Sequence, residues 1–183
     1  MKKILLFSLV AIFMAATGLA QNVATMKAGV VMTTHKAAVA KSEKNKGTFY
    51  FKKPGKFCLS INGGKSAMIM NGNTYTMVRG GHKSVAKGET AAYFRTLQTV
   101  LNTVITGGRI SSLESLPGVS VDGGVITIVP TGKKRQLFSS FVVTVAGRSL
   151  QSLKMNGKSK NYTLYTFSSR EYNEPVSDAV FVK

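Results

Sequence analysis

Residues 47–57 read GTFYFKKPGKF, a pattern typical of two β-strands joined by a tight turn. Side chains in a strand point alternately to opposite faces, so Phe49 and Phe51 share one face of the first strand. Pro54-Gly55 supplies the turn, because proline and glycine favour its backbone angles. The second strand alternates apolar with polar side chains, and its apolar positions are Phe57, Leu59 and Ile61. The stretch therefore predicts a hairpin with one aromatic face.

A second hairpin is predicted at residues 66–77, where Asn71-Gly72 separates two alternating runs. Asn-Gly favours a type I′ turn, since both central positions of that turn need a positive φ. A two-residue loop at this place would pair Met70 with Asn73. The apolar side chains of the two runs then share one face, and they are Met68, Met70, Tyr75 and Met77.

The rest of the chain alternates in the same way, with one exception. Strands are predicted at residues 29–38, 125–129, 137–145, 150–155, 162–167 and 180–182. Residues 89–106 instead carry apolar side chains at helical spacing. That stripe consists of Phe94, Leu97, Leu101, Val104 and Ile105. Gly107-Gly108 ends the helix, and residues 80–88 are predicted to be a flexible loop that leads into it.

A single helix cannot cover a flat sheet of about ten strands, because a large apolar face would stay in contact with water. Curling the sheet into a full or partial barrel, with the helix plugging it, removes that exposure. We therefore predict a mainly β (α+β) fold: a curved antiparallel sheet with a helical lid over an apolar cavity. Residues 21–183 contain no internal repeat or linker, so a single domain is expected.

The first 20 residues have the three parts of a signal peptide. Two lysines precede an apolar run at residues 4–16, and Gly18-Leu19-Ala20 supplies a cleavage site. The apolar run is shorter than the roughly 20 residues of a membrane-spanning helix. Because the residue directly after the cleavage site is Gln21 and not a cysteine, a lipid anchor is not expected there. The sequence predicts a signal peptide at residues 1–20, a mature chain from Gln21, and a location outside the cytoplasm.

The chain is strongly basic, with 25 Lys and Arg against 7 Asp and Glu and a net charge of +18 at pH 7. Such charge often indicates nucleic-acid binding, but dispersed lysines in a secreted protein do not fit that class. A solvated basic surface is one interpretation. Weak attraction to anionic membranes or acidic partners is the other.

The chemistry-bearing residues do not form a recognisable catalytic or metal-binding pattern. His35 and His82 are far apart in the chain, and the few acids are scattered. Cys58 lies opposite the apolar positions of its strand, which predicts a partly buried thiol. We therefore expect no enzyme activity, no metal and no cofactor.

The predicted interior is rich in methionine, which adapts to ligands of variable shape. An ordinary hydrophobic core could have the same composition. Its large residues are Met32, Met68, Met70, Met77, Met155, Phe49, Phe51, Phe57, Phe94, Phe138 and Phe141.

Residues 47–57, with a glycine, an aromatic strand, a basic-proline turn and a further aromatic, resemble the periplasmic outer-membrane lipoprotein carrier (LolA-like) family. The hairpin at residues 68–75, the helix and the tail at residues 177–182 follow in the family's order, so the resemblance covers residues 26–183. It implies an open half-barrel that binds lipoprotein acyl chains and shuttles them from the inner to the outer membrane. The family's N-terminal helix is short or absent here.

In the family, an arginine before the proline bonds to the lid and an aromatic after the turn serves transfer. These positions match Lys53 and Phe57, although lysine lacks the planar donor fork of arginine. The predicted cavity and lid residues are Phe49, Phe51, Lys53, Phe57, Leu59, Met68, Met70, Tyr75, Met77, Phe94, Leu97, Leu101, Val104 and Ile105.

The resemblance also implies the partners of a monomeric carrier. They are acylated lipoproteins, an inner-membrane transporter as donor, an outer-membrane acceptor and a transiently contacted anionic membrane surface. Nucleic acid is not among them. Three alternatives stay open: a sensor or shuttle for another lipid on the same fold, a basic structural or surface-binding protein, and a secreted hydrolase.

Overall fold

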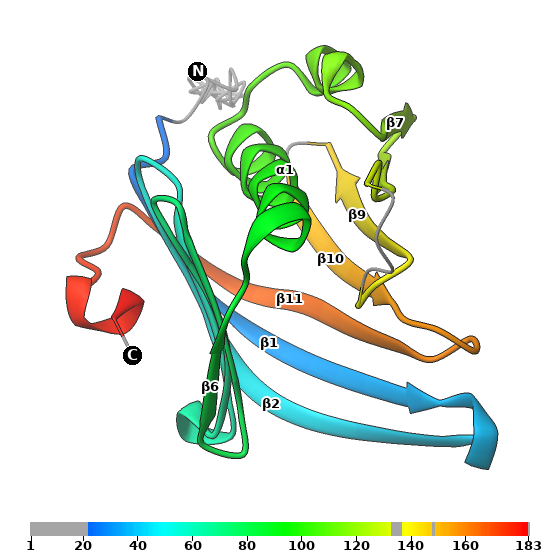
Figure 1. Cartoon of the computed structure of the whole chain (residues 1–183). Helices are drawn as coiled ribbons and strands as arrows, with labels where there is room; N and C mark the ends of the chain where they lie inside the picture. Colours follow the sequence, from blue (N-terminus) through cyan, green and yellow to red (C-terminus); the bar gives the residue numbers. More distant parts are fainter. Residues whose placement is uncertain (1–21, 133–136, 148, 183) are drawn as a thin grey trace, which may run out of the picture.

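The computed structural model describes residues 22–132, 137–147 and 149–182, so the predicted signal peptide lies outside the described residues. The fold is mainly β, with one strongly curved antiparallel sheet and one long helix against its hollow side (Figure 1). The strands are β1 Thr25–Lys36, β2 Lys41–Lys52, β3 Lys56–Ile61, β4 Ser66–Asn71, β5 Thr74–Arg79, β6 His82–Val85, β7 Val119–Asp122, β8 Val125–Ile128, β9 Ser140–Ala146, β10 Ser149–Asn156 and β11 Tyr162–Tyr172. The helices are α1 Gly88–Ile105 and four short 3-10 turns, η1 Ala37–Val39, η2 Asn62–Gly64, η3 Ile110–Ser115 and η4 Asp178–Phe181.

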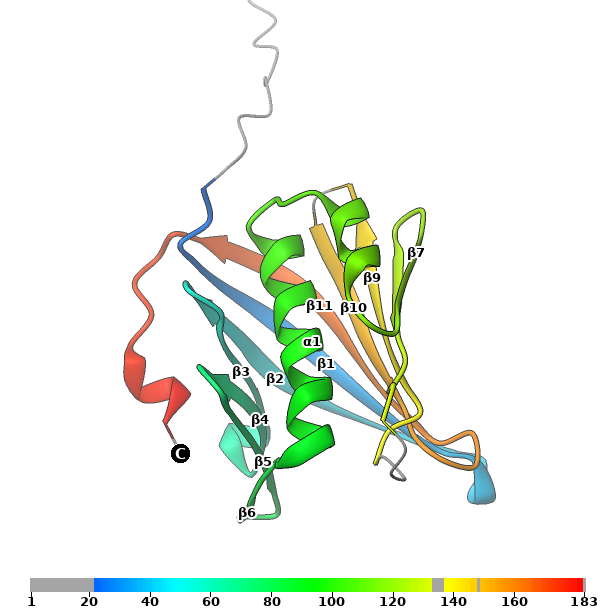
Figure 2. The ribbon, with the colours of Figure 1, turned by 45° about the horizontal axis from the view of Figure 1, so that its top comes forward.

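The sheet has eleven strands in the order β6-β5-β4-β3-β2-β1-β11-β10-β9-β8-β7. Strands that are consecutive in the chain are neighbours in the sheet, except β6 and β7, which lie at opposite edges. At the centre, β1 pairs with β11. The edges are β6 and β7, and α1 connects one edge to the other across the hollow face (Figure 2). The predicted open half-barrel with a helix over its hollow is confirmed.

Helix α1 follows from its sequence pattern. Its buried residues are Tyr93, Phe94, Leu97, Val100, Leu101, Val104 and Ile105, so the predicted stripe does face the sheet. Glu89 in the first turn suits the positive end of the helix dipole. Gly107, with a φ of 75°, takes the left-handed position that ends the helix.

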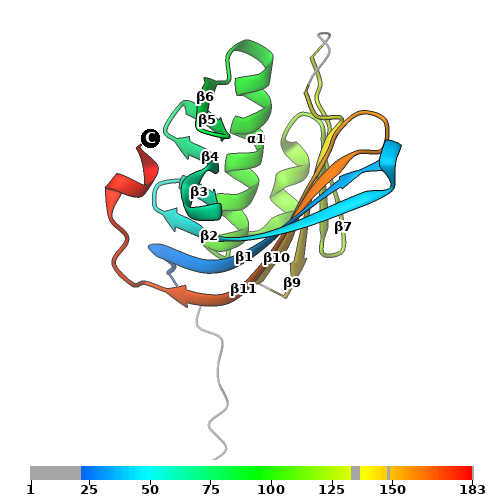
Figure 3. The ribbon, with the colours of Figure 1, turned by 90° about the horizontal axis from the view of Figure 1, so that it is seen from below.

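Apolar side chains form two clusters, one on each face of the sheet. The larger cluster lies in the hollow and includes the buried side of α1. The smaller cluster lies on the outer face, where the C-terminal segment that ends in η4 covers β3 and β4 (Figure 3). It consists of Cys58, Ala67, Ile69, Val78, Val176 and Phe181. Cys58 is thus fully buried on the face opposite the hollow, whereas only partial burial was predicted.

Gly47, the first residue of residues 47–57, pairs with Ile61 and packs closely against the backbone of β3. A Cβ atom at this position would lie 2.2 Å from the carbonyl oxygen of Ser60. No other residue type fits there without moving the neighbouring backbone.

The predicted register of the β4–β5 hairpin is wrong by two positions. Met70 pairs with Tyr75, and the loop is Gly72-Asn73, flanked by the pair Asn71 and Thr74. Gly72 has a φ of 56°, so the left-handed position falls on glycine. This register also places an aromatic opposite Met70 in place of a polar asparagine. Because the shift is even, every side chain keeps its predicted face.

Other boundaries also differ from the prediction. Residues 80–88 contain the edge strand β6, and β9 begins at Ser140, after the predicted start at residue 137. Residues 180–182 do not form a closing strand. Phe181 instead enters the outer cluster from the turn η4, whose first residues are held by a hydrogen bond from the Ala179 amide to Ser177 Oγ.

Candidate functional site

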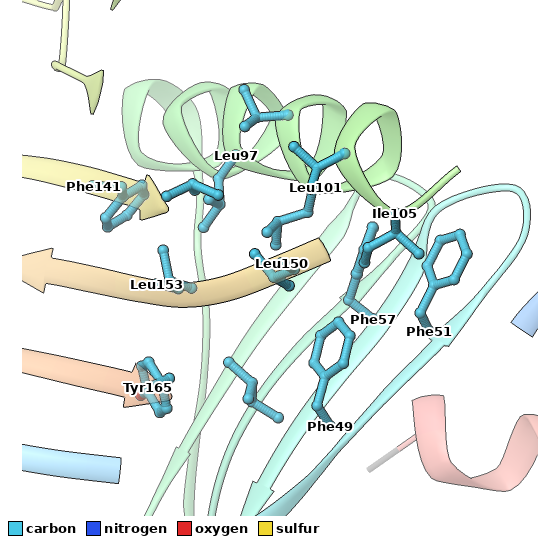
Figure 4. Packing of buried hydrophobic residues seen from close by; sticks show 14 of the residues in the cluster. Phe49, Phe51, Phe57, Leu97, Leu101, Ile105, Phe141, Leu150, Leu153 and Tyr165 are labelled. Atoms are coloured by element: carbon cyan, nitrogen blue, oxygen red, sulfur yellow. The ribbon is translucent and has the colours of Figure 1, made fainter. Parts of the chain in front are cut away.

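The aromatic side chains of β2 and β3 fill one half of the hollow beneath the end of α1 (Figure 4). The ring of Phe57 lies 5.1 Å from that of Phe51 and 6.2 Å from that of Phe49. Each of these three rings is at most 1% exposed, and Ile105 of α1 points toward them. Phe57 therefore belongs to the packed interior.

The other half of α1 packs against β5 and β9. Tyr93 stacks on Phe141 with 4.1 Å between the ring centroids, and Phe94 lies between Tyr75 and Phe141. The Tyr93 hydroxyl donates to the Ile128 carbonyl oxygen at 2.9 Å. Burial raises the pKa of Tyr93, so this hydroxyl remains a neutral donor at physiological pH. The helix is thus tied to β8 on this side.

A single polar side chain of α1, Gln98, ties the helix to the opposite wall. Its Nε2 donates to the carbonyl oxygens of Gly55 at 2.7 Å and Gly72 at 3.1 Å. Its Oε1 accepts from the Tyr75 hydroxyl at 3.0 Å. These contacts join the helix to the β2–β3 turn, the β4–β5 turn and β5. One helical turn later, Asn102 Oδ1 is buried without a hydrogen-bond partner among the described residues.

The part of the hollow that α1 does not fill is a cavity of about 330 Å³. This volume is at the lower end of the range of small-molecule sites. One wall comes from β3, β4 and β5 and the other from β1, β10 and β11. The lining residues are Met32, Thr34, Leu59, Ile61, Ser66, Ala67, Met68, Met77, Val78, Arg79, Phe138, Met155, Thr163 and Tyr165.

The residues predicted for the site fall into three groups. Leu59, Met68 and Met77 line the open cavity. A second group packs beneath α1 or belongs to its buried stripe and fills the hollow: Phe49, Phe51, Phe57, Met70, Tyr75, Phe94, Leu97, Leu101, Val104 and Ile105. Lys53 stands apart from both groups.

The predicted bond from Lys53 to the helix is wrong. Its Nζ donates to Asn22 Oδ1, and its backbone amide donates to the Ala24 carbonyl oxygen at 2.9 Å. The pairing of β2 with β1 brings Lys53 to the beginning of the described chain, away from α1. Gln98, on the helix itself, makes the hydrogen bond to the β2–β3 turn.

Sequence reasoning missed Gln98 and Arg79. Gln98 follows Leu97 at the edge of the apolar stripe, and its partners lie in turns that are distant in sequence. Arg79 lies at an odd-numbered position of β5, on the same face as Tyr75 and Met77. That alternation was a usable signal for a cation inside the hollow.

The family model for the outer membrane lipoprotein carrier protein LolA matches residues 21–183. The chain belongs to the LolA family. No curated protein matches this LolA-family chain as a relative. No helix among residues 22–132, 137–147 and 149–182 is long and apolar enough to cross a membrane.

Solved structures resemble this LolA-family protein at low identity. A DUF1329 family protein from Desulfovibrio piger has a TM-score of 0.45 and 14% identity, over 88% of this chain and 91% of that chain. A putative outer membrane lipoprotein-sorting protein domain from Vibrio parahaemolyticus has a TM-score of 0.41 and 9% identity, over 86% and 89%. A LolA superfamily protein from Nitrosomonas europaea has a TM-score of 0.38 and 11% identity, over 87% and 90%.

Proposed function

We propose that this LolA-family protein is a periplasmic carrier that binds the acyl chains of lipoproteins in its hollow and shuttles them from the inner to the outer membrane. The observation that carries the proposal is the apolar cavity beside α1, lined by methionine, leucine and aromatic side chains from both walls of the sheet. Binding is non-covalent, and no catalytic step is part of the mechanism.

The energetics suit a carrier. A chain of about 16 carbons gains on the order of 10 kcal/mol on leaving water, at ~0.8 kcal/mol per methylene. A carrier needs to approach the affinity of the membrane without greatly exceeding it. The flexible side chains of Met32, Met68, Met77 and Met155 can adjust to chains of different shape.

In the proposed mechanism, α1 is a lid that moves outward to admit chains. The present cavity of about 330 Å³ has room for part of a cargo, and displacing α1 would open the aromatic half as well. Gln98 and Tyr93 supply the hydrogen bonds that must break. The unsatisfied Asn102 Oδ1 weakens the closed position, because a buried polar atom without a partner costs about 1–3 kcal/mol.

The proposed membrane contact involves the end of the sheet where the β1–β2 and β10–β11 hairpins project together (Figure 3). The two tips are joined by a hydrogen bond from the Ala37 amide to Asn161 Oδ1 at 2.8 Å. We call the exposed lysines of these tips the basic end: Lys36, Lys41, Lys44, Lys46, Lys158 and Lys160. Positive charge there would favour encounter with an anionic membrane next to a donor transporter or an acceptor.

Export of the chain is part of the proposal. Cleavage after Ala20 would give a monomeric mature protein that begins at Gln21, with or without cyclisation of the glutamine. Intact-mass measurement of the protein from the periplasmic fraction tests this. A mass that retains residues 1–20, or that includes a diacylglycerol adduct, would contradict it.

Binding of an acyl probe to a cavity-filling variant tests the carrier function. Met77 is half-buried on the cavity wall, so Met77→Trp should fill the cavity and reduce binding at least several-fold. Val85→Trp is the matched control, because Val85 is 46% exposed on the edge strand β6. Native mass spectrometry of the protein from periplasm should also detect acylated cargo. Equal binding by both variants, with no co-purified lipid, would refute the proposal in favour of a structural protein.

A shuttle for a smaller lipid is the second candidate, and the size of the cavity favours it. About 330 Å³ accommodates one chain more readily than several. The identity of the co-purified molecule distinguishes the two candidates, since a free amphiphile and a lipidated peptide differ greatly in mass.

A further inference from the structure

The lining of the cavity changes from apolar to polar toward its mouth. The change occurs at a cross-strand pair on each of the two walls. On one wall, the cross-strand pair Met68 and Met77 is followed two residues outward by Ser66 and Arg79. Steps of two residues keep side chains on one face of a sheet. The cavity therefore has an apolar interior and, on this side, a cationic mouth.

The opposite wall repeats the gradient. Met32 pairs with Tyr165, and two residues outward Thr34 pairs with Thr163. Two threonine hydroxyls thus face the same mouth as Ser66 and Arg79. This arrangement matches a molecule with an apolar chain and a polar head.

Arg79 is the only charged side chain in the cavity lining, and it has no ion pair among the described residues. The four ion pairs of the described chain use lysines: Lys27, Lys41, Lys52 and Lys56. No carboxylate lines the cavity to neutralise the guanidinium. The positive charge of Arg79 also acts inside the hollow. Burial raises the pKa of Tyr165 to about 12, and the charge of Arg79 opposes that rise.

We propose that Arg79, with the hydroxyls of Ser66, Thr34 and Thr163, binds the anionic head of an amphiphile whose acyl chain occupies the cavity. The head is a phosphate or a carboxylate. This inference rests on the proposed function for the chain-binding part of the site and adds the chemical class of the cargo. A guanidinium presents planar, paired N–H donors that match both kinds of oxyanion, and hydroxyls supply further donors.

Because Arg79 is exposed, its contact with an anionic head contributes more to selectivity than to total binding affinity. Water already solvates the free guanidinium, so an empty mouth carries little penalty. The apolar chain supplies most of the affinity, and Arg79 selects among cargoes with the same chain. An anionic head should therefore bind more tightly than a neutral head on an identical chain.

Displacement of the neutral fluorophore N-phenyl-1-naphthylamine measures this selection. The competitors are tetradecanoate, tetradecyl phosphate and the neutral tetradecyl maltoside, tested on the full mature protein. Arg79→Gln should weaken both anionic competitors about tenfold, as expected for one charge-assisted hydrogen-bonding group. Its affinity for the maltoside should not change. Arg95→Gln, at an exposed position on the outer side of α1, removes the same charge elsewhere and should change nothing.

The outcomes separate the two hypotheses. Equal affinities for anionic and neutral heads, in both wild type and Arg79→Gln, would overturn the head-group inference and leave the carrier standing. Failure of the fluorophore and of all three chains to bind would refute the carrier and this inference together. Inorganic phosphate at millimolar concentration should not displace tetradecanoate. If it does, Arg79 belongs to a site for free anions and the inference is wrong.

Discussion

Gln98 is a neutral residue in a strongly basic chain, yet it makes the contacts that hold α1 against one wall of the sheet. Its amide group donates twice and accepts once, which neither lysine nor glutamate could reproduce. Both turns that it joins present a glycine carbonyl, at Gly55 and Gly72. Hydrogen bonds of a neutral amide are insensitive to pH and salt, so in the proposed mechanism the opening of α1 would depend on cargo alone.

Removing this latch should loosen the lid. Gln98→Leu keeps the side-chain volume but deletes three hydrogen bonds, at a cost of about 1–3 kcal/mol in the free energy of unfolding. Stopped-flow uptake of the neutral naphthylamine fluorophore should become faster, because α1 opens more often. Thr99→Val, on the exposed side of α1, is the control, since the Thr99 hydroxyl bonds only within its helix. Lower stability with unchanged uptake would show that Gln98 is structural and not a latch.

Phe57 matches the family's aromatic residue that serves transfer, but in this structure its side chain is part of the packed interior. It is 1% exposed between Phe49 and Phe51, so Phe57→Ala should cost about 3–5 kcal/mol and Phe57→Leu less than about 1.5 kcal/mol. Urea unfolding measures both values. A cost below about 1 kcal/mol for the alanine variant would place Phe57 outside the packed interior. Any loss of transfer in Phe57 variants must therefore be compared at equal folded fraction.

At the scale of elements, the C-terminal segment shows how one carboxylate fixes a non-strand element to the sheet. Asp178 begins η4, and its two oxygens accept from Lys56 Nζ at 2.8 Å and Lys52 Nζ at 3.1 Å. The Lys56 hydrogen bond, and then the Lys52 one, hold the pKa of Asp178 below its usual value. Phe181 then covers the buried thiol side of β3.

The lowered pKa makes docking of this segment sensitive to acid. A carboxyl with a depressed folded-state pKa stabilises the fold above its unfolded pKa of about 3.9, and the contribution disappears as pH falls through the folded value. The thermal midpoint of wild type should exceed that of Asp178→Asn at pH 7, and the difference should vanish in strong acid. Glu174→Gln, whose carboxylate has no ion pair among the described residues, is the control. A difference that persists at low pH would exclude the carboxylate as its cause.

The spacing of apolar residues correctly predicted the helix and strands that bury one face. It failed for features that depend on contacts between distant parts of the chain. The stripe of α1 and the faces of β2 to β5 follow from periodicity, which does not depend on partners. The β4–β5 register depends on which residue takes the left-handed position, and Asn71 and Gly72 were both suitable. The edge strand β6 is exposed throughout, so it has no apolar alternation to detect. The contacts of Gln98 cannot be predicted locally, because they require two turns and β5 to meet the helix in space.

At the scale of the whole molecule, the positive charge is distributed over the outer surface, and the hollow is mainly apolar. The basic end contains one local acid, Glu43, which pairs with Lys41 at 3.3 Å. The hollow contributes only Arg79 to the charge of the cavity lining. In the proposed mechanism, encounter with the membrane therefore depends on surface charge, and retention of cargo depends on apolar contacts in the hollow.

This separation predicts opposite responses to salt. Raising ionic strength from about 0.01 M to 0.5 M should slow loading from vesicles rich in phosphatidylglycerol, because screening shortens the range of attraction from roughly 30 Å to a few ångströms. Preloaded complexes should keep their cargo. Lys158→Gln with Lys160→Gln should mimic salt in its effect on loading rate, whereas Lys83→Gln with Lys87→Gln, away from the basic end, should not. Release of cargo by salt alone would contradict the prediction.

The strand order also determines the order in which the strands can pair during folding. From β1 the chain runs outward to one edge at β6, crosses with α1 to the other edge at β7, and returns inward to β11. Within each half, every later strand can pair with the strand just before it as soon as both are free to fold. The central seam between β1 and β11 has no such early partner, because its two strands come from opposite ends of the chain. If the chain is exported as proposed, the hollow acquires its second wall only when translocation is almost complete. A chain that is still being exported could then not capture the proposed cargo.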